Sequence, residues 1–156
     1  MKRLALLLSL PFLTAATTPT IVKWSASNAR ITPAKSGAGV IRVRATIVKG
    51  WHVYALTQKG LGPKPLAFEL DGKQSFALGA PKGPVPQKAY DAEFGTETAT
   101  YSGSPEFLIP VRALGASRAG KTDLHLVVRY QACSDNLCLP PRKEALTVTV
   151  DRAPGA

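Results

Sequence analysis

The sequence predicts an all-β fold, an antiparallel β-sandwich of immunoglobulin-like type, with a β-barrel as the alternative. Composition is the first reason: 13 Gly and 13 Pro among 156 residues suit turn-rich β structure and are poorly tolerated by long helices. The second reason is a series of short segments in which apolar and polar residues alternate, separated by turn residues. With 45% hydrophobic and 19% charged residues, the chain has the composition of one globular domain.

Residues 40–47 show the clearest alternation. Ile41 and Val43 fall on one face of the expected strand, and Arg42 and Arg44 fall on the other, which predicts a strand with one buried face. The same period recurs in residues 66–70, 124–130 and 146–150, and more weakly in residues 21–25, 53–56, 98–101 and 107–111.

Turn residues punctuate these segments at 49–50, 60–65, 71–72 and 102–105. The stretch from Gly79 to Gly95 is longer than the others and rich in Pro and Gly. Its far end carries Tyr90, Asp91, Glu93 and Phe94. Because loops of that length are usually functional or loosely ordered, we single this one out as a candidate functional loop.

The first sixteen residues have the order of a secretory signal peptide. Lys2 and Arg3 precede an apolar run that ends at Leu13, and small residues lead to an expected cleavage after Ala16. The run is about ten residues, short of the roughly 20 that a membrane span needs. We therefore expect an exported protein that is soluble after cleavage, with an N-terminal segment holding a first strand (17–37), a sandwich domain (38–151) and a tail (152–156).

The chain is strongly basic, with a formal net charge of +10 that falls to +8 without Lys2 and Arg3. Its cations are scattered singly along the sequence, with no run longer than Arg142-Lys143. Nucleic-acid binding normally shows as a clustered stripe, so we expect no nucleic-acid partner. Such a charge favours acidic partners or an anionic membrane surface.

Cys133 and Cys138 follow the expected strand at 124–130 and are separated by four residues. Asp135-Asn136 between them is good turn material, so we expect the two sulfurs to face each other across a tight connection. Closing so short a loop gives only about 2 kcal/mol in the chain-entropy model, and a chain of this length buries enough apolar surface without it. A structural disulfide and a reversible exchange site both remain open from the residues alone.

Other chemistries find less support. Two cysteines together with His52 and His125 make no obvious four-ligand zinc site, and spacing alone ties neither histidine to a cysteine as a catalytic base. We expect no metal and no cofactor.

The segment Tyr130-Gln131-Ala132-Cys133 followed by Cys138-Leu139-Pro140-Pro141 resembles the signature of the N-terminal periplasmic domain of the DsbD thiol:disulfide interchange protein. Three further segments agree with it, spread between residues 38 and 150. They are Gly50-Trp51-His52-Val53-Tyr54, Asp91-Ala92-Glu93-Phe94, and Tyr101-Ser102-Gly103 leading to Phe107-Leu108-Ile109-Pro110-Val111.

The resemblance implies an immunoglobulin-like sandwich with protein-disulfide reductase activity. Such a domain receives electrons from a thioredoxin-like domain or a DsbD-type membrane electron transporter. It passes them to oxidised periplasmic proteins such as disulfide isomerases or cytochrome c maturation factors. Cys133 and Cys138 would cycle between dithiol and disulfide, with Cys138 forming the mixed disulfide with a partner.

The resemblance also implies a cap loop, in which an aromatic residue covers the cysteines until a partner arrives. Phe94 matches that aromatic residue, with Asp91 and Glu93 beside it. Tyr54 matches a tyrosine near the pair, and His52 stands where another aromatic residue is common.

The chain departs from the family's pattern in two ways. The best-known members have five residues between the cysteines, and this chain has four. The family's full-length proteins continue into a membrane-embedded transporter and a thioredoxin-like domain, so we expect this chain to work with separate partners. The rival function is an exported binding module of immunoglobulin-like fold whose disulfide is only structural.

Overall fold

The computed structural model describes residues 20–32, 37–58, 62–115 and 119–154. The expected signal peptide, residues 1–16, lies outside the described residues. All regular secondary structure in the described ranges is β-strand. The strands are β1 (Val22–Ala26), β2 (Ala29–Ile31), β3 (Ala38–Ile47), β4 (Trp51–Tyr54), β5 (Ala67–Leu70), β6 (Phe76–Leu78), β7 (Gln87–Asp91), β8 (Thr96–Tyr101), β9 (Glu106–Ala113), β10 (Gly120–Tyr130), β11 (Ala132–Ser134) and β12 (Arg142–Arg152).

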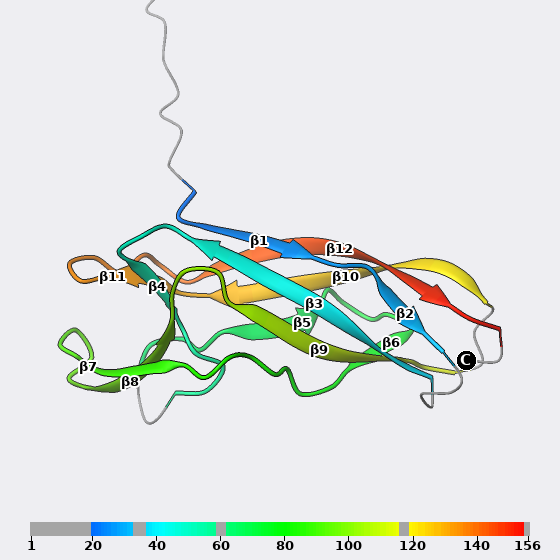
Figure 1. Cartoon of the computed structure of the whole chain (residues 1–156), viewed down its shortest axis with the longest axis horizontal. Helices are drawn as coiled ribbons and strands as arrows, with labels where there is room; N and C mark the ends of the chain where they lie inside the picture. Colours follow the sequence, from blue (N-terminus) through cyan, green and yellow to red (C-terminus); the bar gives the residue numbers. More distant parts are fainter. Residues whose placement is uncertain (1–19, 33–36, 59–61, 116–118, 155–156) are drawn as a thin grey trace, which may run out of the picture.

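The strands form three four-stranded sheets. Two of them, with strand orders β1-β3-β9-β6 and β2-β12-β10-β5, are the layers of the sandwich. The third, β11-β4-β8-β7, extends one end of the molecule, on the left of Figure 1. It is this end sheet that carries both cysteines.

The two long layers pack together because each strand presents its apolar residues to the other sheet. Alternate residues of β3 and β10 are buried while those between them are exposed. Trp24 of β1 joins the layers, because its ring lies 6.2 Å from Phe107 in its own sheet and 6.1 Å and 5.4 Å from Phe68 and Tyr130 in the other. Aromatic contacts of this kind add to the stabilisation from area burial.

The predicted sandwich is confirmed, and the barrel alternative is wrong because the sheets have separate edge strands. Each of the eight expected segments forms a strand, although β4 covers residues 51–54 and not 53–56. All strand pairs are antiparallel except β12 with β2, which is parallel.

The sequence pattern did not predict β2, β6, β7 or β11. Three of these have only three residues, too few for an alternation to appear. β7 lies inside the stretch from Gly79 to Gly95, which we expected to be a loop, and most of its side chains are exposed. Arg152, placed in the expected tail, is the buried last residue of β12, with its guanidinium 6.0 Å from the centre of the Phe76 ring.

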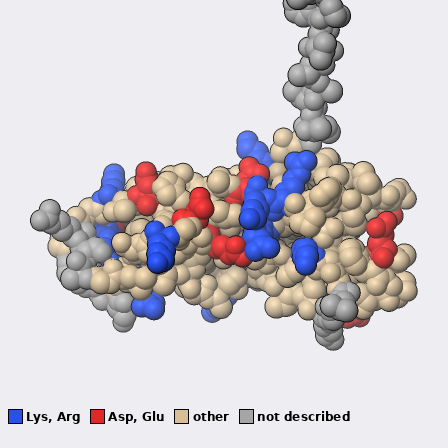
Figure 2. Space-filling view, turned by 180° about the vertical axis from the view of Figure 1, so that it is seen from behind, with Lys and Arg blue, Asp and Glu red and all other residues tan. Residues whose placement is uncertain are grey.

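Charge is not uniform over the surface. Figure 2 views the molecule from behind, and acidic side chains lie there among the basic ones. The end of that face farthest to the right shows acidic side chains without basic ones.

Candidate functional site: the disulfide and its surroundings

The two cysteines lie opposite each other in a tight hairpin. β11 carries Cys133, and the chain returns so that Cys138 pairs with it antiparallel and bonds to it as a disulfide. Backbone hydrogen bonds on either side, from Ser134 N to Leu137 O at 2.8 Å and from Leu139 N to Ala132 O at 2.9 Å, close the hairpin. The expected turn is confirmed: Asp135 and Asn136 form its tip.

The two cysteines differ in accessibility. Cys133 is buried, with 1% of its surface exposed, whereas Cys138 is half-buried. Cys138 is therefore the more accessible cysteine of the pair.

Strand β4 brings His52 and Tyr54 to the hairpin. His52 is the register partner of Cys133 across the antiparallel pair of β4 and β11, so their side chains share a face of the sheet. Tyr54, two residues further on, falls on the same face. Its ring stands edge-on to His52, with the centroids 5.5 Å apart.

The Tyr54 hydroxyl lies beside the disulfide. It lies 3.3 Å from Cys133 Sγ and 3.8 Å from Cys138 Sγ. It also donates a hydrogen bond of 2.8 Å to Asp91 Oδ2. One buried hydroxyl thus links a carboxylate to both sulfurs.

Asp91 shapes the connection between β7 and β8. While its Oδ2 accepts from Tyr54, its Oδ1 accepts from the backbone N–H groups of Glu93 at 3.0 Å and Phe94 at 3.4 Å. Gly95 follows with φ = 63°, a conformation that most other residues adopt only with strain. The same carboxylate therefore fixes both the Tyr54 hydroxyl and the backbone that carries Phe94.

Phe94 packs on Tyr54. The two rings meet edge to face, with centroids 5.8 Å apart and planes at 85°, and Phe94 is half-buried. Phe94 therefore covers the tyrosine that contacts the sulfurs. Glu93 beside it is exposed.

The buried position of these groups affects their protonation. Burial raises the pKa of Tyr54, and its hydrogen bond to Asp91 and the negative charges of Asp91 and Glu93 raise it further. The hydroxyl thus keeps its proton as a donor throughout the physiological range. Burial lowers the pKa of His52, against the opposing effect of Asp91 and Asp135.

A cavity of about 320 Å³ joins these groups into one site. Both cysteines line it, together with four of the five residues expected around them: His52, Tyr54, Asp91 and Glu93. The fifth, Phe94, reaches the site through its contact with the Tyr54 ring.

Two further residues of the cavity were not predicted from the sequence. Thr98 is buried, and its hydroxyl donates to Asp91 Oδ2 at 3.5 Å. Asp135 lines the cavity as well, although the sequence suggested only a role in the turn. The polar Thr98 at an inward position of an alternating strand was the one available signal, because a buried hydroxyl needs a partner.

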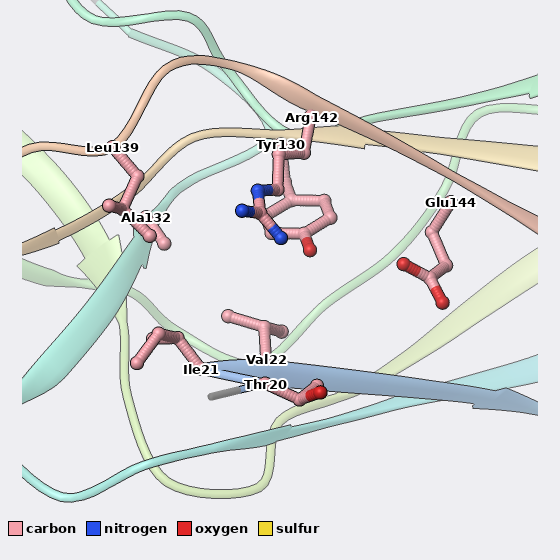
Figure 3. A pocket seen from close by; sticks show the side chains of 8 residues that line it. All are labelled: Thr20, Ile21, Val22, Tyr130, Ala132, Leu139, Arg142 and Glu144. Atoms are coloured by element: carbon pink, nitrogen blue, oxygen red, sulfur yellow. The ribbon is translucent and has the colours of Figure 1, made fainter. Parts of the chain in front are cut away.

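A second pocket, of about 140 Å³, lies under the base of the hairpin (Figure 3). Ala132 and Leu139, the chain neighbours of the two cysteines, line one side of it, and Thr20 and Val22 at the start of β1 lie opposite. The residues that line it include neither cysteine, so it does not give access to the disulfide.

The described ranges contain no group of three or more His, Cys, Asp or Glu side chains arranged to hold a metal ion. In the same ranges, no helix has the length and apolar character needed to cross a membrane.

Comparison with known proteins assigns the chain to a family. Residues 20–150 match the family model described as thiol:disulfide interchange protein DsbD, N-terminal. The chain belongs to this family. Membership in the DsbD N-terminal family identifies the chain as a thiol–disulfide exchange domain and confirms the resemblance inferred from the cysteine segment.

Two solved structures share the fold. One is the DsbD N-terminal domain of Neisseria meningitidis in the reduced form, with 21% identity and a TM-score of 0.53 over 71% of this chain and 77% of that chain. The other is the N-terminal periplasmic domain of ScsB from Proteus mirabilis, with 18% identity and a TM-score of 0.56 over 86% of this chain and 48% of that chain. None of the curated proteins matches the chain.

Proposed function

We propose that the chain is a periplasmic electron relay that works by reversible opening of the Cys133–Cys138 disulfide. The observation that carries the proposal is the Tyr54 hydroxyl, which contacts Cys133 Sγ at 3.3 Å while it is hydrogen-bonded to Asp91. A purely structural disulfide needs no buried donor aimed at its sulfurs. Exchange is favoured by one, because cleavage of the disulfide leaves negative charge on the departing sulfur.

The relay takes up electrons in two exchange steps. A thiolate of the reduced donor attacks Cys138 Sγ, the half-buried sulfur. The Cys133–Cys138 bond breaks, its electron pair stays on Cys133 Sγ, and the donor is joined to Cys138 by a mixed disulfide. The donor's second thiolate then attacks the donor sulfur of the mixed disulfide and releases Cys138 as a thiolate. Two electrons have moved, the donor holds a disulfide, and the chain takes up two protons as a dithiol.

The reverse sequence delivers the electrons. The Cys138 thiolate attacks a disulfide of the acceptor, and one acceptor sulfur leaves as a thiolate. Cys133 then attacks Cys138 Sγ, re-forms the disulfide and releases the second acceptor thiolate. The buried position of Cys133 suits a sulfur that reacts only within the chain.

Tyr54 stabilises the charge that appears on Cys133 in the first step. Its raised pKa keeps the hydroxyl protonated. The single hydroxyl proton, donated to Asp91 in the disulfide form, turns to Cys133 Sγ at 3.3 Å when the charge develops there. Asp91 holds the hydroxyl in place.

The donor is a thioredoxin-like protein or a membrane electron transporter of the DsbD type. The acceptor is an oxidised disulfide isomerase or a cytochrome c maturation factor. Membership in the DsbD N-terminal family supports these partner classes.

A trapping experiment tests the relay and the roles of the two cysteines. A thioredoxin-like partner with a single cysteine is first joined to thionitrobenzoate through a mixed disulfide. The Cys133→Ala variant should displace the thionitrobenzoate and form a stable Cys138–partner disulfide, visible on a non-reducing gel. Cys138→Ala should trap little, because Cys133 is buried.

The opposite gel pattern would reverse the two roles. If neither variant trapped the partner, the relay would lose its main support. The reduction potential of the pair separates the relay from the rival binding module, since a value below about −300 mV indicates a structural disulfide.

A further inference from the structure

The outer face of the sheet β1-β3-β9-β6 carries a set of five exposed cations, which we call the basic face. Its members are Lys23, Arg42, Arg44, Lys82 and Arg112. They are scattered along the sequence, but strand pairing brings them to the same side of the sheet, with the buried core on the other side.

The register shows how these cations come together. Arg42 of β3 pairs with Leu108 of β9, and Lys82 pairs with Leu108 from the opposite side. Arg112 pairs with Ala38, at the other end of the same two strands. Paired residues in antiparallel strands have side chains on one face, so the cations are spread over the width of the sheet.

Glu106 is the one acidic residue among the outward-facing positions of these strands that the structure describes. It accepts from Arg42 at 3.1 Å and from Arg44 at 3.0 Å. These two guanidinium groups hold the pKa of Glu106 below its usual value, so it stays anionic and offsets one cation. The face keeps a net charge of +4.

The other two sheets carry a different balance of charge. On the outer face of the opposite sheet, four cations are set against three anions, and Figure 2 shows the two kinds intermixed. These residues are Arg30, Lys121, Arg129 and Lys143 with Glu69, Asp123 and Asp151. The described strands of the sheet that carries the disulfide, with their turns, hold more anions than cations. The anions are Asp91, Glu93, Glu97 and Asp135, and the cations are Lys88 and Lys49, the latter in the turn before β4.

We infer that the basic face docks the protein on an anionic phospholipid surface. A bilayer with anionic headgroups presents an extended layer of negative charge, which attracts clustered Lys and Arg side chains. The cations match such a layer because they are spread over four neighbouring segments of a sheet face and do not converge on one groove. Val40, 46% exposed, and the half-buried Leu108 lie among them and suit the apolar edge of the headgroup layer.

Docking by this face leaves the disulfide accessible. The cysteines belong to the sheet at one end of the molecule, whereas the basic face belongs to one of the two long layers (Figure 1). The protein would lie along the bilayer with its acidic end open to partners. This inference rests on charge placement and is independent of the proposed exchange.

Vesicle binding of the full chain tests the inference. The probes are vesicles of phosphatidylcholine alone and of phosphatidylcholine with phosphatidylglycerol, at low and high salt. The test variant is Lys23→Gln/Lys82→Gln/Arg112→Gln, three exposed positions that form no salt bridge or side-chain hydrogen bond in the described structure. Arg42 and Arg44 are left in place because their loss would remove both salt bridges of Glu106 and leave its negative charge unpaired.

The matched control is Arg30→Gln/Lys121→Gln/Lys143→Gln on the opposite layer. It removes the same charge and keeps the same N-terminal residues, so any binding by the apolar run near the N-terminus is equal in both variants. Thermal unfolding checks that both variants are folded.

We expect the test variant to bind anionic vesicles roughly ten- to a hundredfold more weakly than the wild type, and the control less than about threefold more weakly. High salt should remove the difference. Equal losses in the two variants would overturn the inference, because net charge alone would then explain binding. Wild-type binding to polyglutamate but not to anionic vesicles would also overturn it, in favour of an acidic protein partner.

Discussion

The hydroxyl of Tyr54 donates to the carboxylate of Asp91 at 2.8 Å, directly beside the disulfide. Asp91 in turn holds the backbone of the turn that carries Phe94. The donor at the sulfurs and the ring that covers it are therefore positioned by one carboxylate.

Replacing Tyr54 with Phe should slow exchange with a thioredoxin-like dithiol by about ten- to a hundredfold, because it removes the donor to the departing Cys133 sulfur. Stopped-flow measurement of disulfide reduction gives the rate. Tyr101→Phe is the control, since Tyr101 is also a buried tyrosine but packs on Phe107 in the core. A rate unchanged in Tyr54→Phe would remove the hydroxyl from the mechanism.

Much of the fold follows from local pattern. The long strands alternate over enough residues for the period to be evident, and Gly and Pro mark their ends. β7 has no such signal, because its sequence Gln-Lys-Ala-Tyr-Asp has no buried apolar row and its side chains are mostly exposed. β7 is a strand because it pairs with β8, and the sequence of β7 alone does not predict that pairing.

The site, like the fold, has one part that local sequence predicts and one part that it does not. The hairpin around Cys133 and Cys138 could be predicted because a two-residue turn of Asp and Asn is a local property. The contact of Tyr54 with Asp91 joins residues 37 positions apart and depends on the order of strands in the end sheet. From the sequence, only the resemblance to the family predicted that Tyr54 and Asp91 lie near the cysteines.

Phe94→Ala should make the disulfide react faster with small thiols and disulfide reagents. Loss of the ring exposes Tyr54 and opens the side of the site that Phe94 covers. We expect an increase of several-fold in the rate of reduction by dithiothreitol, measured under conditions where the protein is folded. Val85→Ala removes an apolar side chain that is 93% exposed and does not line the cavity, and it should have little effect. Equal rates in wild type and Phe94→Ala would contradict a shielding role.

Reduction of the disulfide should leave the fold intact. The closed loop is short, and the chain-entropy model gives a loss of about 2 kcal/mol in the free energy of unfolding. Most of the buried core belongs to the strands of the two long layers, and neither cysteine is part of it. Thermal unfolding with and without reductant should show a decrease in Tm of roughly 5–10 °C. Global unfolding upon reduction would instead mark the disulfide as a structural staple.

His52 makes the stability of the oxidised protein depend on pH. Burial lowers the pKa of His52 in the folded state from its ordinary value of 6.5. At pH values below 6.5 and above the folded-state pKa, the unfolded chain binds more protons than the folded chain, so the free energy of unfolding decreases as the pH falls. The decrease should stay below about 1 kcal/mol, because the ring is only half-buried and solvent screens its charge.

Urea unfolding of the oxidised protein between pH 8 and pH 5 measures this dependence. His52→Phe keeps an aromatic ring beside Tyr54 but has no titrating group, so its free energy of unfolding should fall less over this range than that of the wild type. His125→Gln, which changes the exposed histidine of β10, should keep the wild-type decrease because His52 is still present. Carboxylates away from His52 contribute equally to all three proteins, so the difference between the curves belongs to His52 and its interaction with Asp91 and Asp135. Parallel curves for His52→Phe and the wild type would show that burial of the imidazole does not oppose its protonation.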